Sequence, residues 1–582
     1  MPPGRANACR RFQESEAEVM MEHSGDRLRY AMLVTLLGAV LATAQERPLP
    51  PTRITLPSDS LAAGRTPTKL EADSSRIELP DVVVLGQDRS VRQVESKRRS
   101  GDEQPRLLRP EYQSLSIFAR RDNSRPLVNA AAAARERLIW ANAAAGSYTS
   151  VAADAGYSGK FPWGSARLSG WFDRSNGAFN NSRHADGGLA ATATTPLRKE
   201  LHGRAQAEMN WLNRGLHGAV LDDLNRRAVH SLLAGEADFA IDPLSSARAG
   251  LQLAGAGMST DSSSHELQHS GDFIIGLHSS YQRQMERVTL RAHAAYTRDS
   301  YSAEPDSLDA TIGFSQIRAE VQTSLLRNLQ LTAAIGYQEC SRGRFAPSLR
   351  LAFIPNDRWG ITAAAWSGLR YVTFRERLQE NPFLAHNLSM AADDSPLSLQ
   401  VQSDFRPVGT MVFNFGLFHG RYDQLNYWQR DEESGFIGLH QVGNVHLTEL
   451  QAGVRVGLHA GMMLQGEFHL NSDHLREAVG QGDDDRIPYR PDYRARASLG
   501  MPLPWQLQLT AQLDMVGERR RGLDQDGRLP EYILLDAGIG RKFGRHLHAE
   551  FTVKNILDRR YVVWEGYDEP GIQFMAGARW AY

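Results

Sequence analysis

The last eleven residues of the chain, Ile572–Tyr582, read IQFMAGARWAY. Phe574, Trp580 and Tyr582 share one face of an extended chain here, and the positions between them are mostly small or polar. A soluble protein seldom ends this way, because a terminal strand with an exposed aromatic face invites aggregation. In an outer-membrane barrel this face meets lipid, and the terminal rings sit at the membrane interface. The stretch therefore predicts the closing strand of a transmembrane β-barrel, with these three rings at the interface.

Composition agrees with a barrel and excludes a helical membrane protein. The 582 residues have a mean hydropathy of -0.42, and no apolar run approaches the roughly 18 residues that a spanning helix needs. A barrel exposes apolar side chains to lipid only at alternate positions, so low average hydropathy is expected. The formal net charge of -1 gives no reason to expect a nucleic-acid partner.

The start of the chain predicts a secretory signal peptide over residues 1–44. Arg27 and Arg29 precede a short apolar run that closes on small residues, which is the order of a signal sequence. The residues before this run fit a signal poorly, so Met20 or Met21 is a candidate for the true start. The signal predicts export, and the barrel pattern then predicts the bacterial outer membrane.

Residues 45–135 are rich in Pro, Ser, Arg and acidic residues and show little periodicity. This composition predicts a mostly disordered periplasmic extension or linker. A short β-prone island stands out at 77–86. Its centre is the candidate segment for energy coupling or partner binding, and consists of Asp81, Val82, Val83 and Val84.

From residue 136 to residue 582 the sequence alternates with a period of two. The stretches 288–296 and 547–553 show the pattern clearly, with apolar residues at every second position. A β-sandwich would look similar over one strand. The alternation continues for over four hundred residues without a clear helical segment, and this persistence favours one large antiparallel barrel.

Ten short breaks fit tight turns and set the strand count. They lie at 161–164, 196–200, 242–244, 283–286, 327–328, 355–357, 406–409, 457–461, 502–504 and 542–545. Longer polar segments between them are expected to be loops, and include 176–186, 298–309, 375–394, 472–490 and 517–530. Short turns on one side and long loops on the other are typical of bacterial outer-membrane barrels. With both barrel termini on the short-turn side, the ten turns predict an all-β fold of about 22 strands.

Several charged residues fall on the polar face of the expected strands. They are Arg167, Asp173, Arg291, Glu550 and Lys554. A wet lumen needs polar lining, and opposite charges can pair across neighbouring strands. The same residues could instead hold a plug-like element or guide a solute.

No pattern predicts catalysis, a cofactor or a metal centre. The acidic loop around Asp524 lacks the first and last ligands of a calcium loop. His265 and His269 would share a strand face but lie roughly 13 Å apart, too far for one ion. A Ser and His pair on neighbouring strands would make a barrel hydrolase conceivable, but no spacing identifies one. The chain is therefore predicted not to be an enzyme.

Several motifs in the barrel region resemble those of TonB-dependent receptors. They are 146–148, 154–159, 366–376, 381–384, 531–536, the NILDRRY stretch at 555–561, and Pro570-Gly571 before the last strand. The resemblance implies transport of a solute across the outer membrane. It also implies as partners the membrane lipid, the barrel assembly machinery, and TonB or a separate plug-like or periplasmic protein.

The chain departs from that family in one respect, because residues 45–135 show no recognisable plug domain. A lumen formed by about 22 strands would leak, so an occluding element is expected. It could be residues 45–135, infolded loops or another protein. The alternative to transport is a plug-less structural or assembly barrel that anchors a periplasmic or surface partner complex.

Overall fold

The computed structural model describes most of the chain after the extension. The described ranges are 137–198, 200–220, 223–261, 268–304, 308–458, 461–475, 486–523 and 527–582. The segments expected to be the signal peptide, the periplasmic extension and the island at 77–86 lie outside the described ranges. In the described ranges, no helix is long and apolar enough to cross a membrane.

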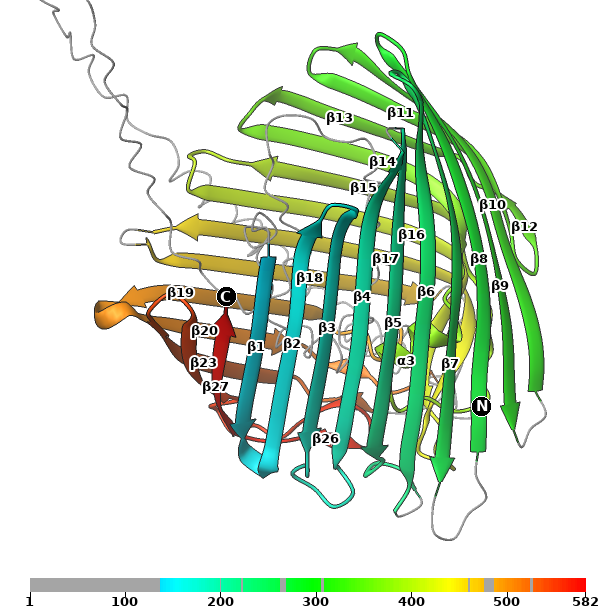
Figure 1. Ribbon diagram of the computed structural model, residues 1–582. Coiled ribbons are helices and arrows are strands. Elements are labelled where there is room, and N and C mark those ends of the chain that lie inside the picture. The colour runs from blue at the N-terminus through cyan, green and yellow to red at the C-terminus, as the bar shows by residue number, and fades with distance from the viewer. Residues whose placement is uncertain are drawn as a thin grey trace, which may run out of the picture. The chain divides into compact units, whose positions relative to one another are not determined.

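One antiparallel sheet dominates the described residues and closes on itself (Figure 1). It contains 23 strands, of which the three-residue β12 (Gly343–Phe345) only extends one hairpin, so 22 strands form the wall. The wall strands are β1 (Arg137–Gly146), β2 (Ser150–Phe161), β3 (Gly164–Ser175), β4 (His184–Arg198), β5 (Leu201–Gly215), β6 (Asn225–Asp242), β7 (Ser245–Asp261), β8 (Gln268–Gln284), β9 (Val288–Glu304), β10 (Leu308–Leu326), β11 (Leu329–Glu339), β13 (Ser348–Asn356), β14 (Trp359–Arg370), β15 (Asp393–Phe405), β16 (Met411–Arg430), β17 (Ile437–Gly457), β18 (Met463–Leu475), β19 (Tyr493–Leu503), β20 (Leu507–Val516), β23 (Tyr532–Phe543), β24 (Leu547–Lys554) and β27 (Gln573–Ala581).

The last strand closes the barrel by pairing with the first. β27 runs antiparallel to β1, with Trp580 opposite Ala141 and Met575 opposite Gly146. On its outer face Phe574 and Trp580 are 44% and 40% exposed. Because strand side chains alternate between faces, the residues at the alternate positions, such as Met575 and Arg579, point inward. The expected transmembrane barrel of about 22 strands is confirmed.

All ten predicted turns fall between consecutive wall strands. The turn between β2 and β3, for example, contains only Pro162 and Trp163, and the turn between β19 and β20 is the short helix η5 (Pro504–Gln506). These turns define the turn end of the barrel, and the opposite end is its loop end. The chain enters and leaves the barrel at the turn end, since the Ala581 N–H donates to the His546 carbonyl in the turn after β23.

One predicted loop is wrong. Residues 298–309 were expected to form a long polar loop, but β9 continues to Glu304 and β10 begins at Leu308, with Ala303 paired to Leu308. Polar composition does not end a strand whose backbone remains paired with its neighbours. At this end of the barrel the ladder therefore runs through a polar stretch.

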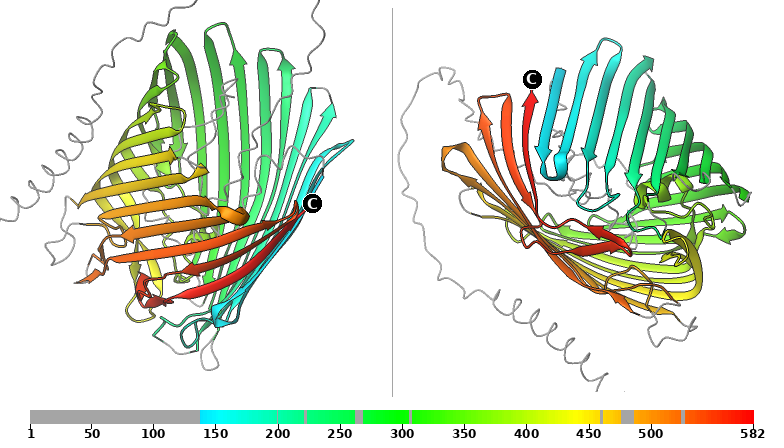
Figure 2. Two further views of the ribbon diagram at one scale, coloured as in Figure 1. Left: turned by 90° about the vertical axis from the view of Figure 1, so that its left-hand side faces the viewer. Right: turned by 90° about the horizontal axis from the view of Figure 1, so that it is seen from below.

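Shorter elements lie at the loop end. They are η3 (Ser147–Thr149), α3 (Phe374–Glu380), the pair β21 (Arg519–Arg520) and β22 (Arg528–Leu529), and the pair β25 (Tyr561–Trp564) and β26 (Tyr567–Glu569). We call residues 371–392, which join β14 to β15 and contain α3, the strap. We call residues 555–572, which join β24 to β27, the hairpin. The view from below shows α3 inside the ring of strands (Figure 2).

Candidate functional site: the lumen and its cap

The barrel encloses a cavity of about 3430 Å³. Asp173, Arg291, Glu550 and Lys554, all predicted from the sequence to face a lumen, line this cavity. Arg167 is placed differently, because its guanidinium lies over the ring of Trp140 at 5.1 Å from the centroid. These residues come from separate strands and do not form one cluster, so a role in guiding a solute stays a prediction.

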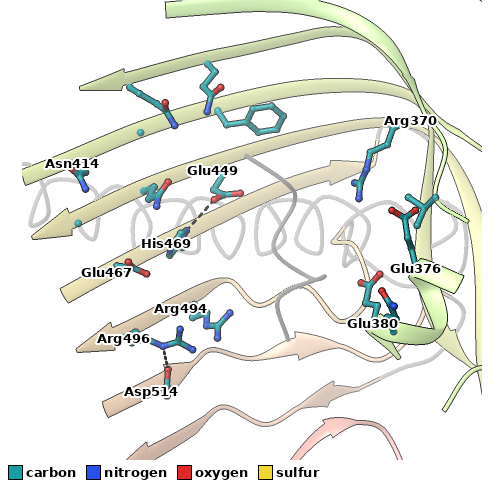
Figure 3. Close-up of a pocket in the computed structure, with 18 of the residues that line it drawn as sticks. Arg370, Glu376, Glu380, Asn414, Glu449, Glu467, His469, Arg494, Arg496 and Asp514 are labelled. Carbon is teal, nitrogen blue, oxygen red and sulfur yellow. Dashed lines mark hydrogen bonds and ion pairs between the residues drawn. The ribbon is translucent and has the colours of Figure 1, made fainter. Parts of the chain in front are cut away.

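Charges on the inner wall pair with charges on neighbouring strands. Arg291 on β9 donates to Glu320 on β10 at 2.7 Å, and Arg318 donates to the same carboxylate at 3.0 Å. Arg496 and Asp514 form a further pair, at 2.6 Å, between β19 and β20 (Figure 3). Each ion pair offsets part of the free-energy cost of removing a charged side chain from water at the inner wall. The lining is therefore polar and charged, but its charges are largely matched.

The strap presents two carboxylates to this cavity, Glu376 and Glu380. Arg370, the last residue of β14, also lines the cavity, and Figure 3 shows all three at the same end of the pocket. Burial raises the pKa of Glu380 to about 7, against the opposing charges of Arg377 and Arg370. The Trp428 indole N–H lies 3.5 Å from the Glu380 carboxylate as a weak donor.

α3 begins at a capping box. The Thr373 hydroxyl accepts from the Glu376 N–H at 3.3 Å, and the Glu376 carboxylate accepts from the Thr373 N–H at 3.1 Å. These reciprocal bonds satisfy backbone donors that a helix start leaves free. A helix of one or two turns is marginal alone, so the buried side chains of Phe374 and Leu378 hold it in place.

Arg226 of β6 fastens the strap to one side of the barrel. Its Nη1 donates to the Pro382 carbonyl at 2.9 Å and to the Leu384 carbonyl at 2.6 Å. The guanidinium also lies 4.8 Å from the centroid of the Phe436 ring, and the residue has no exposed surface. A buried charge needs such partners, because it has lost its water.

A second fastening lies beside the first, around His386 of the strap. Its Nε2 is 2.8 Å from the Thr260 hydroxyl on β7, and its Nδ1 is 3.0 Å from the Ser270 hydroxyl on β8. The Tyr301 hydroxyl on β9 donates to the His386 carbonyl and accepts from the Leu388 N–H at 3.2 Å. We call Arg226, Thr260, Ser270, Tyr301 and His386 the latch.

The other side of the strap is held mainly by backbone. Leu384 forms a parallel bridge with Ile437, where Ile437 N–H donates to the Phe383 carbonyl and Ala385 N–H donates to the Ile437 carbonyl, both at 2.9 Å. The Asn426 amide adds a bond to the Ala391 carbonyl at 2.9 Å. The strap thus connects β6–β9 to β16 and β17.

The hairpin has an arginine anchor of its own. Arg519 of β21 donates to the Val563 carbonyl at 3.1 Å and to the Val562 carbonyl at 2.7 Å. Its guanidinium lies 5.2 Å from the centroid of the Tyr532 ring, and burial lowers its pKa. Strap and hairpin share one buried apolar cluster with the loop-end strands, which includes Phe383, Leu384, Trp428, Trp564 and Tyr567. Together they form a cap over the loop end of the cavity.

Sequence reasoning missed this cap. Residues 375–394 were expected only as a long loop, although infolded loops were one of the three candidates for the occluding element. The one local signal was Thr373-Phe-Arg-Glu376, a capping-box pattern that predicts a helix start. The partners that fold the strap inward lie far away in sequence, as with Arg226 and Leu384, so no local pattern reveals them.

The described residues contain no group of three or more His, Cys, Asp or Glu side chains placed to hold a metal ion. Cys340, the one cysteine in the described ranges, has a free thiol. The site is therefore a polar cavity with a cap.

Comparison with known proteins places the fold. No family model matches the sequence, and no curated protein matches it. Among solved structures, a variant of the ferric enterobactin receptor of Pseudomonas aeruginosa has a TM-score of 0.61 at 13% identity, and covers 77% of this chain and 80% of its own. The ferric-catecholate import receptor of E. coli K12 has a TM-score of 0.63 at 10% identity, covering 77% and 82%. A copper transporter has a TM-score of 0.62 at 11% identity, covering 77% and 80%.

At these identities the shared property is the fold. The chain folds as an antiparallel β-barrel of the type found in TonB-dependent receptors of the outer membrane. The solved structures named here that share this fold are receptors or transporters by name.

Proposed function

We propose that the chain moves a polar solute across the bacterial outer membrane through its lumen, with the cap as the outer gate. The observation that carries the proposal is the cavity of about 3430 Å³, lined by matched charges and bounded at the loop end by strap and hairpin. Long loops face the cell surface in such barrels. The cap therefore lies where a solute would arrive.

The solute class follows from the lining and from the structural neighbours. Two of the neighbours are named for ferric siderophores and one for copper. The described residues offer no cluster of ligands for a bare metal ion, and this favours a complete chelate or another large polar solute. Ferric catecholates are accordingly the first probes, with copper as the comparison.

Energy coupling is proposed to pass through the island at 77–86, with Asp81–Val84 as the contact to TonB or to another periplasmic protein. The support is the sequence resemblance alone, since the island lies outside the described residues. Replacing Val82, Val83 and Val84 with Asp should then abolish energised uptake without changing the folded barrel. Replacing an equal number of residues elsewhere in 45–135 is the matched control.

Uptake tests the whole proposal. Cells that make the chain should accumulate labelled ferric catecholate faster than cells without it, and the Asp-substituted island should remove the difference. If neither the chain nor the island changes the uptake of any probe, while crosslinking recovers a periplasmic partner, the assembly-barrel alternative replaces transport.

A further inference from the structure

The latch differs from the rest of the cap in its chemistry. The buried apolar cluster packs against the strap on both sides, since it includes Met258 and Tyr301 of the β6–β9 side as well as Tyr567 of the hairpin. On the β6–β9 side, buried polar groups that include an arginine and a histidine also join the strap to the wall. A buried charge is costly unless it is paired. A change of charge in the latch therefore acts on the β6–β9 side of the strap.

The bonded partners of the His386 imidazole in the latch are uncharged hydroxyls. Nε2 lies 2.8 Å from the Thr260 hydroxyl, and Nδ1 lies 3.0 Å from the Ser270 hydroxyl. The Thr260 hydroxyl also accepts from Arg226 Nε at 3.1 Å. A protonated imidazole would therefore be a buried cation that one hydroxyl separates from the buried Arg226 guanidinium, and two like charges this close are unfavourable.

From this geometry we propose that the strap is a proton-sensitive lid, closed while His386 is neutral and released from β6–β9 when its imidazole gains a proton. The proposal deepens the proposed transport function by naming what opens the outer gate. The release itself does not depend on whether the barrel transports anything, and can be measured separately.

The pKa of His386 depends on the charged groups around it. Burial, together with the charges of Arg226 and His269, lowers the pKa of His386 to about 2. Asp272, the nearest carboxylate on the Ser270 strand, is already bonded to the Ala256 and Arg375 N–H groups at 2.6 and 3.0 Å. Asp299, on the Tyr301 strand, accepts from the Tyr371 hydroxyl at 2.7 Å. The imidazole nitrogens bond to the Thr260 and Ser270 hydroxyls rather than to either carboxylate.

Protonation of Glu380 on the strap acts against the release that protonation of His386 causes. Its pKa is about 7 in the closed strap against an ordinary value of 4.5, so the closed state binds this proton more tightly and acid favours closure. His386 shows the reverse, since the closed state binds its proton less tightly than the released state. Lid opening by His386 is therefore measured most clearly where Glu380→Gln has removed the opposing titration.

A buried thiol can report release of the lid. Ala303 on β9 lies beside Ser270, is 3% exposed and contacts the cap core. In a Cys340→Ser background, Ala303→Cys should react with a water-soluble maleimide only when the strap has left the wall. Glu304→Cys, exposed on the opposite face of the strand, corrects for the pH dependence of thiol reactivity.

The ratio of labelling rates at 303 and 304 in the full-length Glu380→Gln protein is divided by the same ratio in Glu380→Gln/His386→Asn, whose amide can still bond to Ser270. Both proteins retain Asp272 and Asp299, which accept from strap residues, so the comparison cancels their titration. The quotient should rise roughly 25-fold from pH 7 to pH 5, as expected for a released imidazole with its ordinary pKa of 6.5. Arg226→Met should raise the labelling ratio at every pH, and Arg227→Met, at the exposed neighbour, should not.

Each variant is first checked for the heat-dependent gel shift of a folded barrel. A ratio whose pH dependence is the same with and without His386→Asn overturns the proposal. This comparison does not depend on uptake, so an inactive transporter whose ratio depends on His386 would remove the transport function and leave the lid.

Discussion

Phe383 of the strap and Tyr567 of the hairpin stack with their ring centroids 3.8 Å apart and their planes 22° from parallel. The two residues come from loops on opposite sides of the cap, and both are buried. The Tyr567 hydroxyl also donates to the Gly435 carbonyl at 3.3 Å. This stack is the contact through which strap and hairpin close the loop end together.

Phe383→Ala should loosen the cap, because it removes both the stack and a buried ring that is worth about 3–5 kcal/mol in a packed core. Labelling of Ala303→Cys should speed up by roughly tenfold or more. A double-mutant cycle with Tyr567→Ala should give a coupling of about 1 kcal/mol between the rings. Phe551→Ala, which removes an exposed ring on the outer face of β24, should leave labelling unchanged. Additive effects of the two cap substitutions would contradict the role of the stack.

The seam between β1 and β27 should tolerate no side chain at Gly146. A Cβ there would lie 2.2 Å from the Phe574 carbonyl oxygen, which is backbone and cannot move aside. Gly146→Ala should therefore reduce the amount of heat-modifiable, folded barrel in the membrane. Gly257→Ala on β7, where a Cβ would meet nothing within 4 Å, is the matched control and should fold normally. Equal yields of the two variants would argue against the observed closure.

His386→Asn should give the cap a pH dependence of the opposite sign to Glu380→Gln. With the imidazole gone, the raised pKa of Glu380, about 7, makes the cap most stable at low pH. This stabilisation is lost as the pH rises from about 4.5 through 7. Labelling at 303, corrected with 304, should therefore speed up between pH 5 and pH 8. Corrected labelling that stays constant or slows over that range would contradict the raised pKa of Glu380 in the closed strap.

Arg519→Met should free the hairpin. The substitution leaves the Val562 and Val563 carbonyls without their buried donor, at a cost of about 1–3 kcal/mol. Limited proteolysis of the folded protein, read by mass spectrometry, should then show new cuts within 555–572. Arg528→Met, on the partner strand β22 but exposed, should give the wild-type pattern. New cuts with both substitutions would point to general loosening of the loops.

The wall of the barrel could be predicted from the sequence because its signals are local. A period of two fixes which side chains face lipid, as in Phe574 and Trp580, and short punctuated breaks such as Pro162-Trp163 mark each turn. The one wrong loop, at 298–309, shows the limit of polarity as a signal, because β9 and β10 remain paired beyond the apolar part of the wall.

The cap could not be predicted, because its contacts join distant parts of the chain. Arg226 and Leu384 are separated by 158 residues, and a buried arginine that binds carbonyls looks no different in sequence from one in a loop. His386 carries no local pattern either, since its partners Thr260 and Ser270 come from two other strands. What decides such sites is which strands the closed barrel brings together.

The most direct test of the gated lumen is the single-channel conductance of the full-length chain in planar bilayers, with and without the strap. Replacing residues 372–391 with a short Gly-Ser linker removes the lid and leaves β14 and β15 joined. If the cap is the outer gate, the intact chain gives low, steady conductance and the strap-less chain gives a large one. If both are equally silent, another element fills the lumen, and if both conduct equally, the cap does not close it; either result contradicts the account.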